Sequence, residues 1–155
     1  MNRRAFLDMI AASEIGPAML AMPETDNGYK VIVGSTAAHL NLMQSYADHP
    51  RILIAIKPGL NSSAAGRYQL LARYFDAYKR LLNLSDFSPA SQDAIAIQQI
   101  RERNALDDID AGHFQVAVGK VSNIWASLPG NSYGQHVNQM AALENAYEQA
   151  GGTFA

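Results

Sequence analysis

From residue 70 onward, apolar residues recur at the three- and four-residue spacing of amphipathic helices, and this pattern constrains the fold most. The apolar stripes span residues 70–82, 114–125 and 137–147. Ser88-Pro89 opens a further helix, because serine is a good N-cap and proline suits the first helical position. Gly151-Gly152 ends the last helix. The second half of the chain is therefore predicted to consist of packed helices.

The first half of the chain differs from the second. Residues 3–14 place apolar side chains at helical spacing and predict one N-terminal helix. After a loop over residues 16–27, the Tyr, Val and Ile content of residues 29–33 predicts a strand. Residues 52–56 form either a second strand or an irregular loop. A small sheet within residues 29–68, followed by packed helices, is an α+β fold.

Length and composition narrow the classes of function. The 155 residues suit one domain, residues 1–155. The net charge is −2 and the 12 Lys and Arg residues are scattered, which argues against nucleic acid because phosphate binding needs a basic patch. The lack of cysteine excludes a disulfide scaffold and a zinc–thiolate site. Four widely spaced histidines and the lack of a phosphate-binding loop indicate no metal site and no cofactor.

The N-terminus has two possible interpretations. Met1-Asn2-Arg3-Arg4 resembles the basic start of an export signal. However, Asp8 and Glu14 interrupt the apolar run, and no stretch approaches the ~20 apolar residues of a membrane span. We favour an amphipathic helix of the mature protein, with an export signal as the alternative.

Glu14 is the strongest candidate for a catalytic residue. It follows Ile10 by four positions and Phe6 by eight, so a helix aligns its carboxylate with an apolar stripe. It also lies in the last helical turn, where the helix dipole disfavours negative charge. Both effects raise a carboxyl pKa, as a general acid near neutral pH requires. The alternative is a solvated, frayed helix end.

Two polar segments are candidates for ligand binding. In residues 62–69, small residues and glycine let the backbone approach a ligand, and Tyr68 and Gln69 offer groups suited to sugar hydroxyls. The alternative is an ordinary loop before the next helix. In the second segment, Tyr133 and Gln135 follow a Trp-containing Pro-Gly turn that could form a cleft wall. Trp125 itself is better explained as a core residue, because it continues the apolar stripe from residue 114.

Short segments along nearly the whole chain match a known family in order. They are Ala5-Phe6-Leu7-Asp8-Met9, Ser13-Glu14, Thr25-Asp26-Asn27, Gly28-Tyr29-Lys30-Val31-Ile32-Val33-Gly34, Tyr46-Ala47-Asp48-His49-Pro50-Arg51, Ala65-Gly66-Arg67-Tyr68-Gln69-Leu70-Leu71, Asp86-Phe87-Ser88-Pro89, Ser91-Gln92-Asp93-Ala94, Gln98-Gln99-Ile100, Ser122-Asn123-Ile124-Trp125-Ala126-Ser127-Leu128-Pro129-Gly130 and Tyr133-Gly134-Gln135. On these segments the chain resembles the phage lambda endolysin family, the lambda lysozyme-like lytic transglycosylases. Residues 15–24 depart most from the family.

The resemblance implies a lysozyme-like fold, with a helical lobe and a small sheet flanking a cleft for peptidoglycan glycan strands. It implies cleavage of the bond between N-acetylmuramic acid and N-acetylglucosamine, leaving 1,6-anhydro-muramic ends. The family's catalytic glutamate corresponds to Glu14. Tyr68 and Gln69 would position the sugars, with Tyr133 and Gln135 on a facing loop, and residues 51–60 and 127–135 would form the lips of the cleft.

The resemblance leaves two other functions open. A true muramidase would use Asp26 or Asp48 to act on a water molecule, because an ordinary glycosidase needs two carboxylates. A glycan-binding or virion structural module would keep the fold without catalysis. The expected partner is the glycan strand of peptidoglycan and not nucleic acid.

The family also implies a cellular setting. We expect a monomer without stable membrane insertion, held in the host cytoplasm until a holin-type permeabiliser releases it to the periplasm. The near-neutral charge further predicts that long-range attraction to the wall contributes little to binding.

Overall fold

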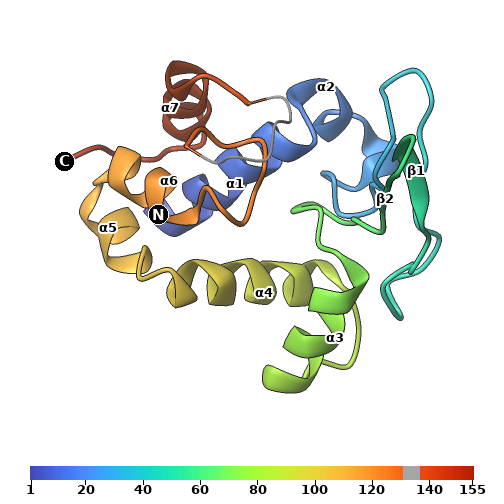
Figure 1. Ribbon diagram of the computed structural model, residues 1–155. Helices are drawn as coiled ribbons and strands as arrows, with labels where there is room; N and C mark the ends of the chain where they lie inside the picture. The colour runs from blue at the N-terminus through green and yellow to red at the C-terminus, as the bar shows by residue number, and fades with distance from the viewer. Residues whose placement is uncertain (131–136) are drawn as a thin grey trace. The chain divides into compact units, whose positions relative to one another are not determined.

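The computed structural model of the chain describes residues 1–130 and 137–155 (Figure 1). Short helices dominate, and one antiparallel hairpin forms the sheet of the described residues. The elements in order are α1 (Asn2–Glu14), α2 (Pro17–Leu20), the 3-10 helix η1 (Pro23–Thr25), β1 (Ile54–Lys57), β2 (Leu60–Ser62), α3 (Ala72–Leu81), α4 (Pro89–Glu102), α5 (Leu106–Ala111), α6 (Phe114–Val121) and α7 (Met140–Gln149). The predicted α+β class is confirmed.

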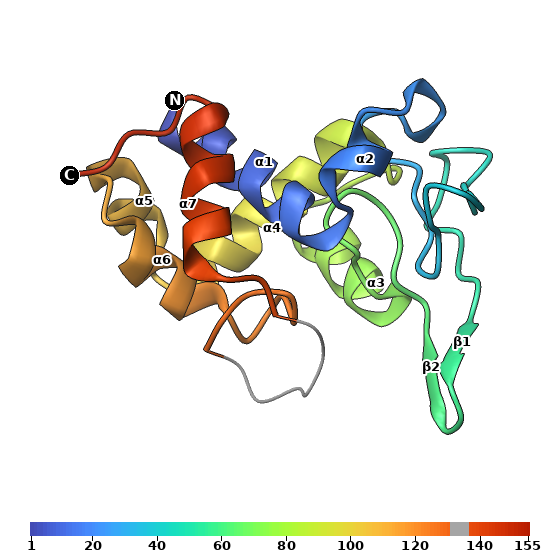
Figure 2. The same ribbon diagram turned by 90° about the horizontal axis from the view of Figure 1, so that it is seen from above.

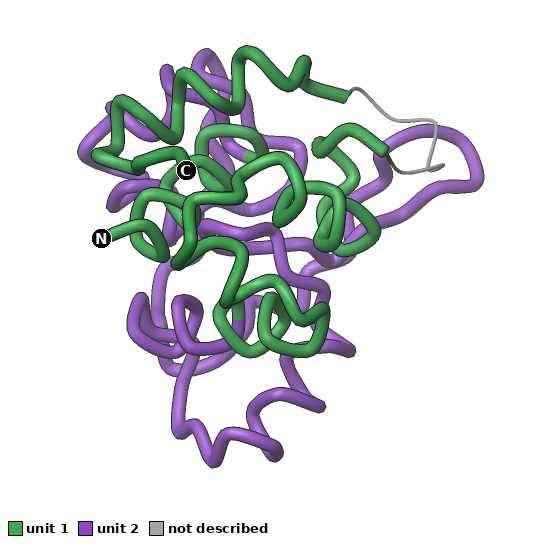
Figure 3. The backbone as a smooth tube through the Cα atoms, turned by 90° about the vertical axis from the view of Figure 1, so that its left-hand side faces the viewer, with its two compact units in different colours: residues 1–14, 96–155 green, residues 15–95 purple. Residues whose placement is uncertain are grey.

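The chain divides into two compact units, drawn in different colours in Figure 3. Unit 1 comprises residues 1–14 and 96–155, and unit 2 comprises residues 15–95. The chain passes from one unit to the other after Glu14 and again inside α4. That residues 1–155 act as one domain stays a prediction.

Unit 1 is built around α1, which packs against α5 and α7 (Figure 2). Its core joins three aromatic rings that are distant in sequence. The ring centroid of Phe6 lies 5.9 Å from that of Phe114 and 6.4 Å from that of Tyr147. The predicted stripes at residues 114–125 and 137–147 are confirmed as α6 and α7. Trp125 lies beyond the end of α6 and is buried, as expected of a core residue.

Unit 2 holds a second apolar core and the sheet. The hairpin of β1 and β2 turns at Pro58-Gly59, where Gly59 has a φ of +78° (Figure 2). Of the two alternatives for residues 52–56, the strand is therefore confirmed, shifted to residues 54–57. The core of this unit consists of buried side chains from loops, α3 and α4: Ile32, Met43, Ala65, Leu70, Phe75, Phe87 and Ile95.

The predicted strand at residues 29–33 is wrong. This segment makes only isolated bridges, from Val31 to Leu42 and from Ile32 to Ala65. Its backbone groups bond to several different segments, so that no neighbouring chain runs beside it for a strand's length. The predicted loop at residues 16–27 likewise contains α2 and η1.

Candidate active site

Glu14 is the last residue of α1, and the packing of this helix decides where its carboxyl lies. Phe6, Met9 and Ile10 on the same helix are fully buried. Glu14 follows Ile10 by one helical turn and is partly buried itself. The carbonyl end of the helix lies beside it, which is a poor environment for a second negative charge.

The Glu14 carboxyl is bound by Ser127 of the same unit. The Ser127 hydroxyl donates a hydrogen bond of 2.5 Å to Glu14 Oε1, and the Ser127 backbone N–H also binds the carboxyl. Burial raises the pKa of Glu14 above its usual value, and the two bonds from Ser127 offset part of this effect. In the described part of the chain no neighbouring charge contributes. Glu14 thus keeps its proton to a higher pH than an exposed glutamate does, which suits a general acid.

Buried neighbours in the sequence and a hydrogen bond from Asn138 hold Ser127 in place. Trp125 and Leu128 are buried, and the Leu128 N–H bonds to the Trp125 carbonyl oxygen at 3.1 Å. The Asn138 N–H bonds to the Ser127 carbonyl oxygen at 2.9 Å. The Asn138 side chain in turn bonds to Ser13, which precedes Glu14. The carboxyl therefore belongs to a hydrogen-bonded cluster from three segments of unit 1.

Tyr68 and Gln69 lie in unit 2, where their polar groups bind other parts of that unit. Tyr68 is buried, and its hydroxyl donates to Asp93 Oδ1 at 2.6 Å. Burial and this bond raise the pKa of Tyr68, so that the hydroxyl keeps its proton. Gln69 has a left-handed φ of +50°, and its Nε2 donates to the Val31 and Gly66 carbonyl oxygens. That these two residues position sugars stays a prediction.

The packing of unit 2 requires a glycine at position 66, in the same segment. Its φ is +83°, and a Cβ added there would lie 2.3 Å from Oε1 of Gln92. The buried Gln92 amide occupies the space that the missing side chain leaves. Internal packing is therefore a sufficient reason for glycine at this position, without a ligand.

The remaining predicted residues divide between described and undescribed parts of the chain. Tyr133 and Gln135 lie outside the described residues, as does part of the predicted lip at residues 127–135. The other predicted lip, residues 51–60, contains β1 and the start of β2. Glu14 belongs to unit 1, whereas Tyr68 and Gln69 belong to unit 2, and the structure describes each within its own unit.

The two aspartates considered as partners of Glu14 each bind other groups within unit 2. Asp26 accepts a 2.5 Å hydrogen bond from the Tyr46 hydroxyl. Asp48 accepts one of 2.9 Å from Arg51, and this bond is the main reason why the pKa of Asp48 is lowered. A carboxylate held ionised in this way is a poor proton donor, but it could still act as a base.

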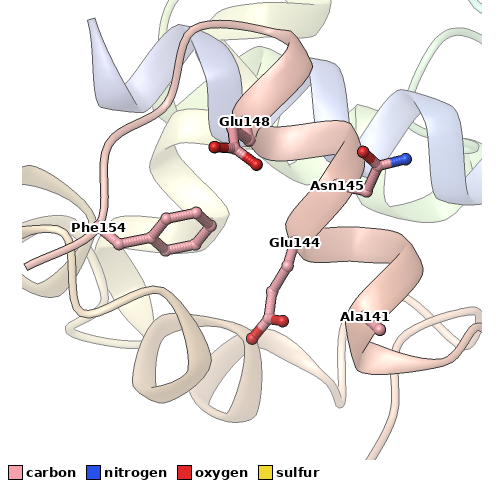
Figure 4. A pocket seen from close by; sticks show the side chains of 5 residues that line it. All are labelled: Ala141, Glu144, Asn145, Glu148 and Phe154. Atoms are coloured by element: carbon pink, nitrogen blue, oxygen red, sulfur yellow. The ribbon is translucent and has the colours of Figure 1, made fainter.

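Other features of the described residues point to no further catalytic centre. A hollow in unit 1 is lined by Ala141, Glu144, Asn145, Glu148 and Phe154, and none of the predicted site residues that the structure describes borders it (Figure 4). No group of three His, Asp or Glu residues within residues 1–130 and 137–155 could hold a metal ion. No helix in those ranges has the length and apolar character of a membrane span.

Sequence reasoning missed the groups that hold Glu14. Ser127 is 113 residues away from it and Asn138 is 125 residues from Ser13, so no periodic pattern connects them. The signals for Ser127 were its place in the segment of residues 122–130 that matches the family and in the predicted lip of residues 127–135. Neither gave the serine a role toward Glu14.

Comparison with known proteins decides the family. A family model described as endolysin matches residues 4–154. The chain belongs to the endolysin family. It is 50% identical over 152 residues to the endolysin of Escherichia phage lambda, covering 98% of this chain and 92% of that protein. It is 45% identical over 160 residues to the endolysin of Escherichia phage P2, covering 99% and 95% of the two chains.

Solved structures agree with this assignment to the endolysins. Bacteriophage lambda lysozyme complexed with a chitohexasaccharide superposes with a TM-score of 0.89 at 48% identity, covering 99% of this chain and 96% of that one. A second structure of lysozyme from bacteriophage lambda gives a TM-score of 0.87 at 49% identity, with the same coverage. The lysozyme-like fold and the family resemblance are confirmed, and the chain is a phage endolysin, a peptidoglycan-cleaving enzyme.

Proposed function

We propose that this endolysin is a lytic transglycosylase, with Glu14 as its single catalytic acid and base. It cleaves the β-1,4 bond from N-acetylmuramic acid to N-acetylglucosamine and leaves 1,6-anhydro-muramic ends. The observation that carries the proposal is the state of the Glu14 carboxyl, whose pKa is raised by burial while Ser127 binds it by its hydroxyl and its backbone N–H. A carboxyl with a raised pKa keeps its proton to a higher pH, as a general acid requires, and can take a proton back once it is ionised.

The reaction needs no second carboxylate. Protonated Glu14 gives its proton to the glycosidic oxygen as the bond from that oxygen to the anomeric carbon breaks, through an oxocarbenium-like transition state. The Glu14 carboxylate then takes the proton from the 6-hydroxyl of the same muramic acid residue. The freed oxygen attacks the anomeric carbon and closes the anhydro ring. Glu14 ends protonated, no water is consumed, and the nucleophile is already part of the bound substrate.

Binding of glycan strands is supported by the relative. Bacteriophage lambda lysozyme, 48% identical to this chain, has been solved in complex with a chitohexasaccharide. We infer that this chain binds the glycan strand of peptidoglycan, with Tyr68, Gln69, Tyr133 and Gln135 positioning the sugars. For Gln69, the described hydrogen bonds use Nε2, so Oε1 is the atom that would accept a bond from a sugar hydroxyl.

A true muramidase is the main alternative, and products separate the two. Wild type and Glu14→Gln are incubated with purified peptidoglycan, and the muropeptides are weighed by mass spectrometry. We expect wild-type ends to be lighter by one water than hydrolysed ends. Glu14→Gln, which cannot donate the proton, should be slower by about 100-fold or more. Predominantly hydrated ends would support the hydrolase, whereas undiminished wall lysis by Glu14→Gln would place the catalytic role elsewhere.

We further propose that the enzyme works as a monomer and reaches the wall with the help of a holin-type membrane permeabiliser. This proposal rests on membership of the endolysin family. Expression in a host cell should cause lysis only when such a permeabiliser is co-expressed. Lysis by the chain alone, without an added permeabiliser, would contradict it.

A further inference from the structure

Glu14 lies at the end of a chain of side-chain hydrogen bonds contained in unit 1. Asn138 Nδ2 donates to Ser13 Oγ at 2.9 Å, and the Ser13 hydroxyl donates to Ser127 Oγ at 2.7 Å. The Ser127 hydroxyl donates to Glu14 Oε1 at 2.5 Å. All four side chains are partly buried, so water competes less for these bonds than it would at an open surface.

The direction of the chain follows from the chemistry of its first member. Asn138 Nδ2 also lies 3.3 Å from the backbone carbonyl oxygen of Ser13, which can only accept a hydrogen bond. The Asn138 group that faces Ser13 must therefore be the NH₂ donor and not the amide oxygen. Ser13 Oγ then accepts from Asn138, and its single hydrogen is left for Ser127.

The same reasoning passes from Ser13 to Glu14. Ser127 Oγ accepts from Ser13, so the one hydrogen of Ser127 is directed at Glu14 Oε1. Oε1 receives a hydrogen bond whether the carboxyl is charged or neutral. A proton on Oε1 would face the hydroxyl hydrogen of Ser127, so this bond favours the charged form of the carboxyl.

We propose that Asn138, Ser13 and Ser127 form a one-way hydrogen-bond chain that keeps a hydrogen-bond donor directed at Oε1 of Glu14 in both charge states of the carboxyl. The proposal rests on the proposed role of Glu14 as acid and base. Ser127 is a positioning residue in contact with the carboxyl, and Ser13 and Asn138 act through it. When Glu14 gives up its proton, the bond from Ser127 becomes charge-assisted and strengthens, which stabilises the carboxylate needed for the second step.

Charged groups on neighbouring elements do not explain the behaviour of Glu14. Helices α5 and α7 pack on α1, and Phe114 of α6 contacts Phe6 of α1. Within α5, Asp108 pairs with Lys120 and Asp110 pairs with Arg3. The full set of charged side chains on α1, α5, α6 and α7 is Arg3, Arg4, Asp8, Glu14, Asp107, Asp108, Asp110, Lys120, Glu144 and Glu148. Within the described part of the chain, burial and the hydrogen bonds from Ser127 are the only causes that shift the pKa of Glu14.

The test uses neutral variants of the full chain, Ser127→Ala, Ser13→Ala and Asn138→Ala. Ser122→Ala is the matched control, because the Ser122 hydroxyl bonds to the Gly119 carbonyl oxygen and lies outside the chain of bonds. The Glu14 carboxyl is titrated by nuclear magnetic resonance of carbon-labelled glutamate and assigned by its loss in Glu14→Gln. Thermal unfolding confirms that each variant is folded.

We expect Ser127→Ala to raise the pKa of Glu14 further and to lower kcat by about ten- to a hundred-fold, the usual effect of losing one hydrogen bond to a charged group. Ser13→Ala and Asn138→Ala should shift the pKa in the same direction by less, with little change in KM. Ser122→Ala should titrate as wild type does. An unchanged Glu14 titration in folded Ser13→Ala and Asn138→Ala would overturn the proposal, as would a lowered pKa in Ser127→Ala.

A second measurement follows the hydrogen bond from Ser127 directly. The Ser127 hydroxyl donates to the protonated carboxyl as well, so Ser127→Ala should raise the C=O stretching frequency of that carboxyl. An unchanged frequency would overturn the proposal. Both readouts follow the Glu14 carboxyl itself and not the product. Hydrated products would therefore contradict the transglycosylase proposal without contradicting the proposed hydrogen-bond chain.

Discussion

Replacement of Gly66 by alanine tests how the segment of residues 62–69 is built. The φ of Gly66 is +83°, a conformation that costs an L-residue about 1–2 kcal/mol. The added Cβ would also lie 2.3 Å from Oε1 and 2.8 Å from Cδ of Gln92, and 3.0 Å from the ring of Phe87. Gln92 must therefore move to admit the methyl group.

The cost of that movement follows from the bonds that Gln92 makes. Its Oε1 accepts from the Arg67 N–H at 2.9 Å, and its Nε2 donates to the carbonyl oxygens of Tyr29 and Phe87 at 3.1 and 2.9 Å. Leaving one buried polar group without its partner costs about 1–3 kcal/mol. Together with the backbone strain, we expect Gly66→Ala to lower the free energy of unfolding by about 2–5 kcal/mol.

Gly59→Ala is the matched control, because Gly59 has a φ of +78° and no atom lies within 4 Å of its added Cβ. Gly59→Ala should lower the free energy of unfolding only by the backbone strain, about 1–2 kcal/mol. Urea unfolding and melting temperatures measure both variants, and each kcal/mol corresponds to about 2–4 °C in a chain of this size. Equal losses in the two variants would refute the argument from Gln92.

Three further predictions concern pH, the second carboxylate and salt. Burial lowers the pKa of His49 below its usual 6.5. As the pH falls below about 6.5, the unfolded chain therefore takes up a proton at His49 before the folded chain does, and the stability should fall. An equal pH dependence of the urea midpoints of wild type and His49→Gln would contradict this. Asp48→Asn should keep most of the rate at which cell-wall turbidity clears, because the proposed reaction needs no second carboxylate and Asp48 binds Arg51; a loss as large as that of Glu14→Gln would favour the hydrolase. With a net charge of −2, the clearing rate should change little between low and physiological ionic strength, and a steep dependence would indicate long-range attraction to the wall.

The parts of the fold that repeat a pattern over several turns could be predicted from the sequence. The apolar stripes predicted α1, α3, α6 and α7, and Ser88-Pro89 predicted the start of α4 at Pro89. Helix α5 has six residues, which is too few for a helical period to be recognised. The strand expected at residues 29–33 failed for another reason: its composition suits a strand, but its backbone partners come from several segments.

The candidate site shows the same division between local and long-range information. The position of Glu14 in the last turn of α1, one turn after Ile10, could be predicted because both depend on spacing within one helix. The Ser127 hydroxyl that binds it comes from a segment 113 residues away, which only the fold brings close. Likewise, nothing local showed that Gly66 makes room for the Gln92 amide.

The central claim is that the muramic acid's own hydroxyl, and not water, attacks the anomeric carbon after Glu14 protonates the leaving oxygen. Digestion of peptidoglycan in water labelled with heavy oxygen tests this claim most directly, with the muropeptides analysed by mass spectrometry. The account predicts 1,6-anhydro ends that carry no label. Hydrated ends that carry one labelled oxygen per cleaved bond would contradict it.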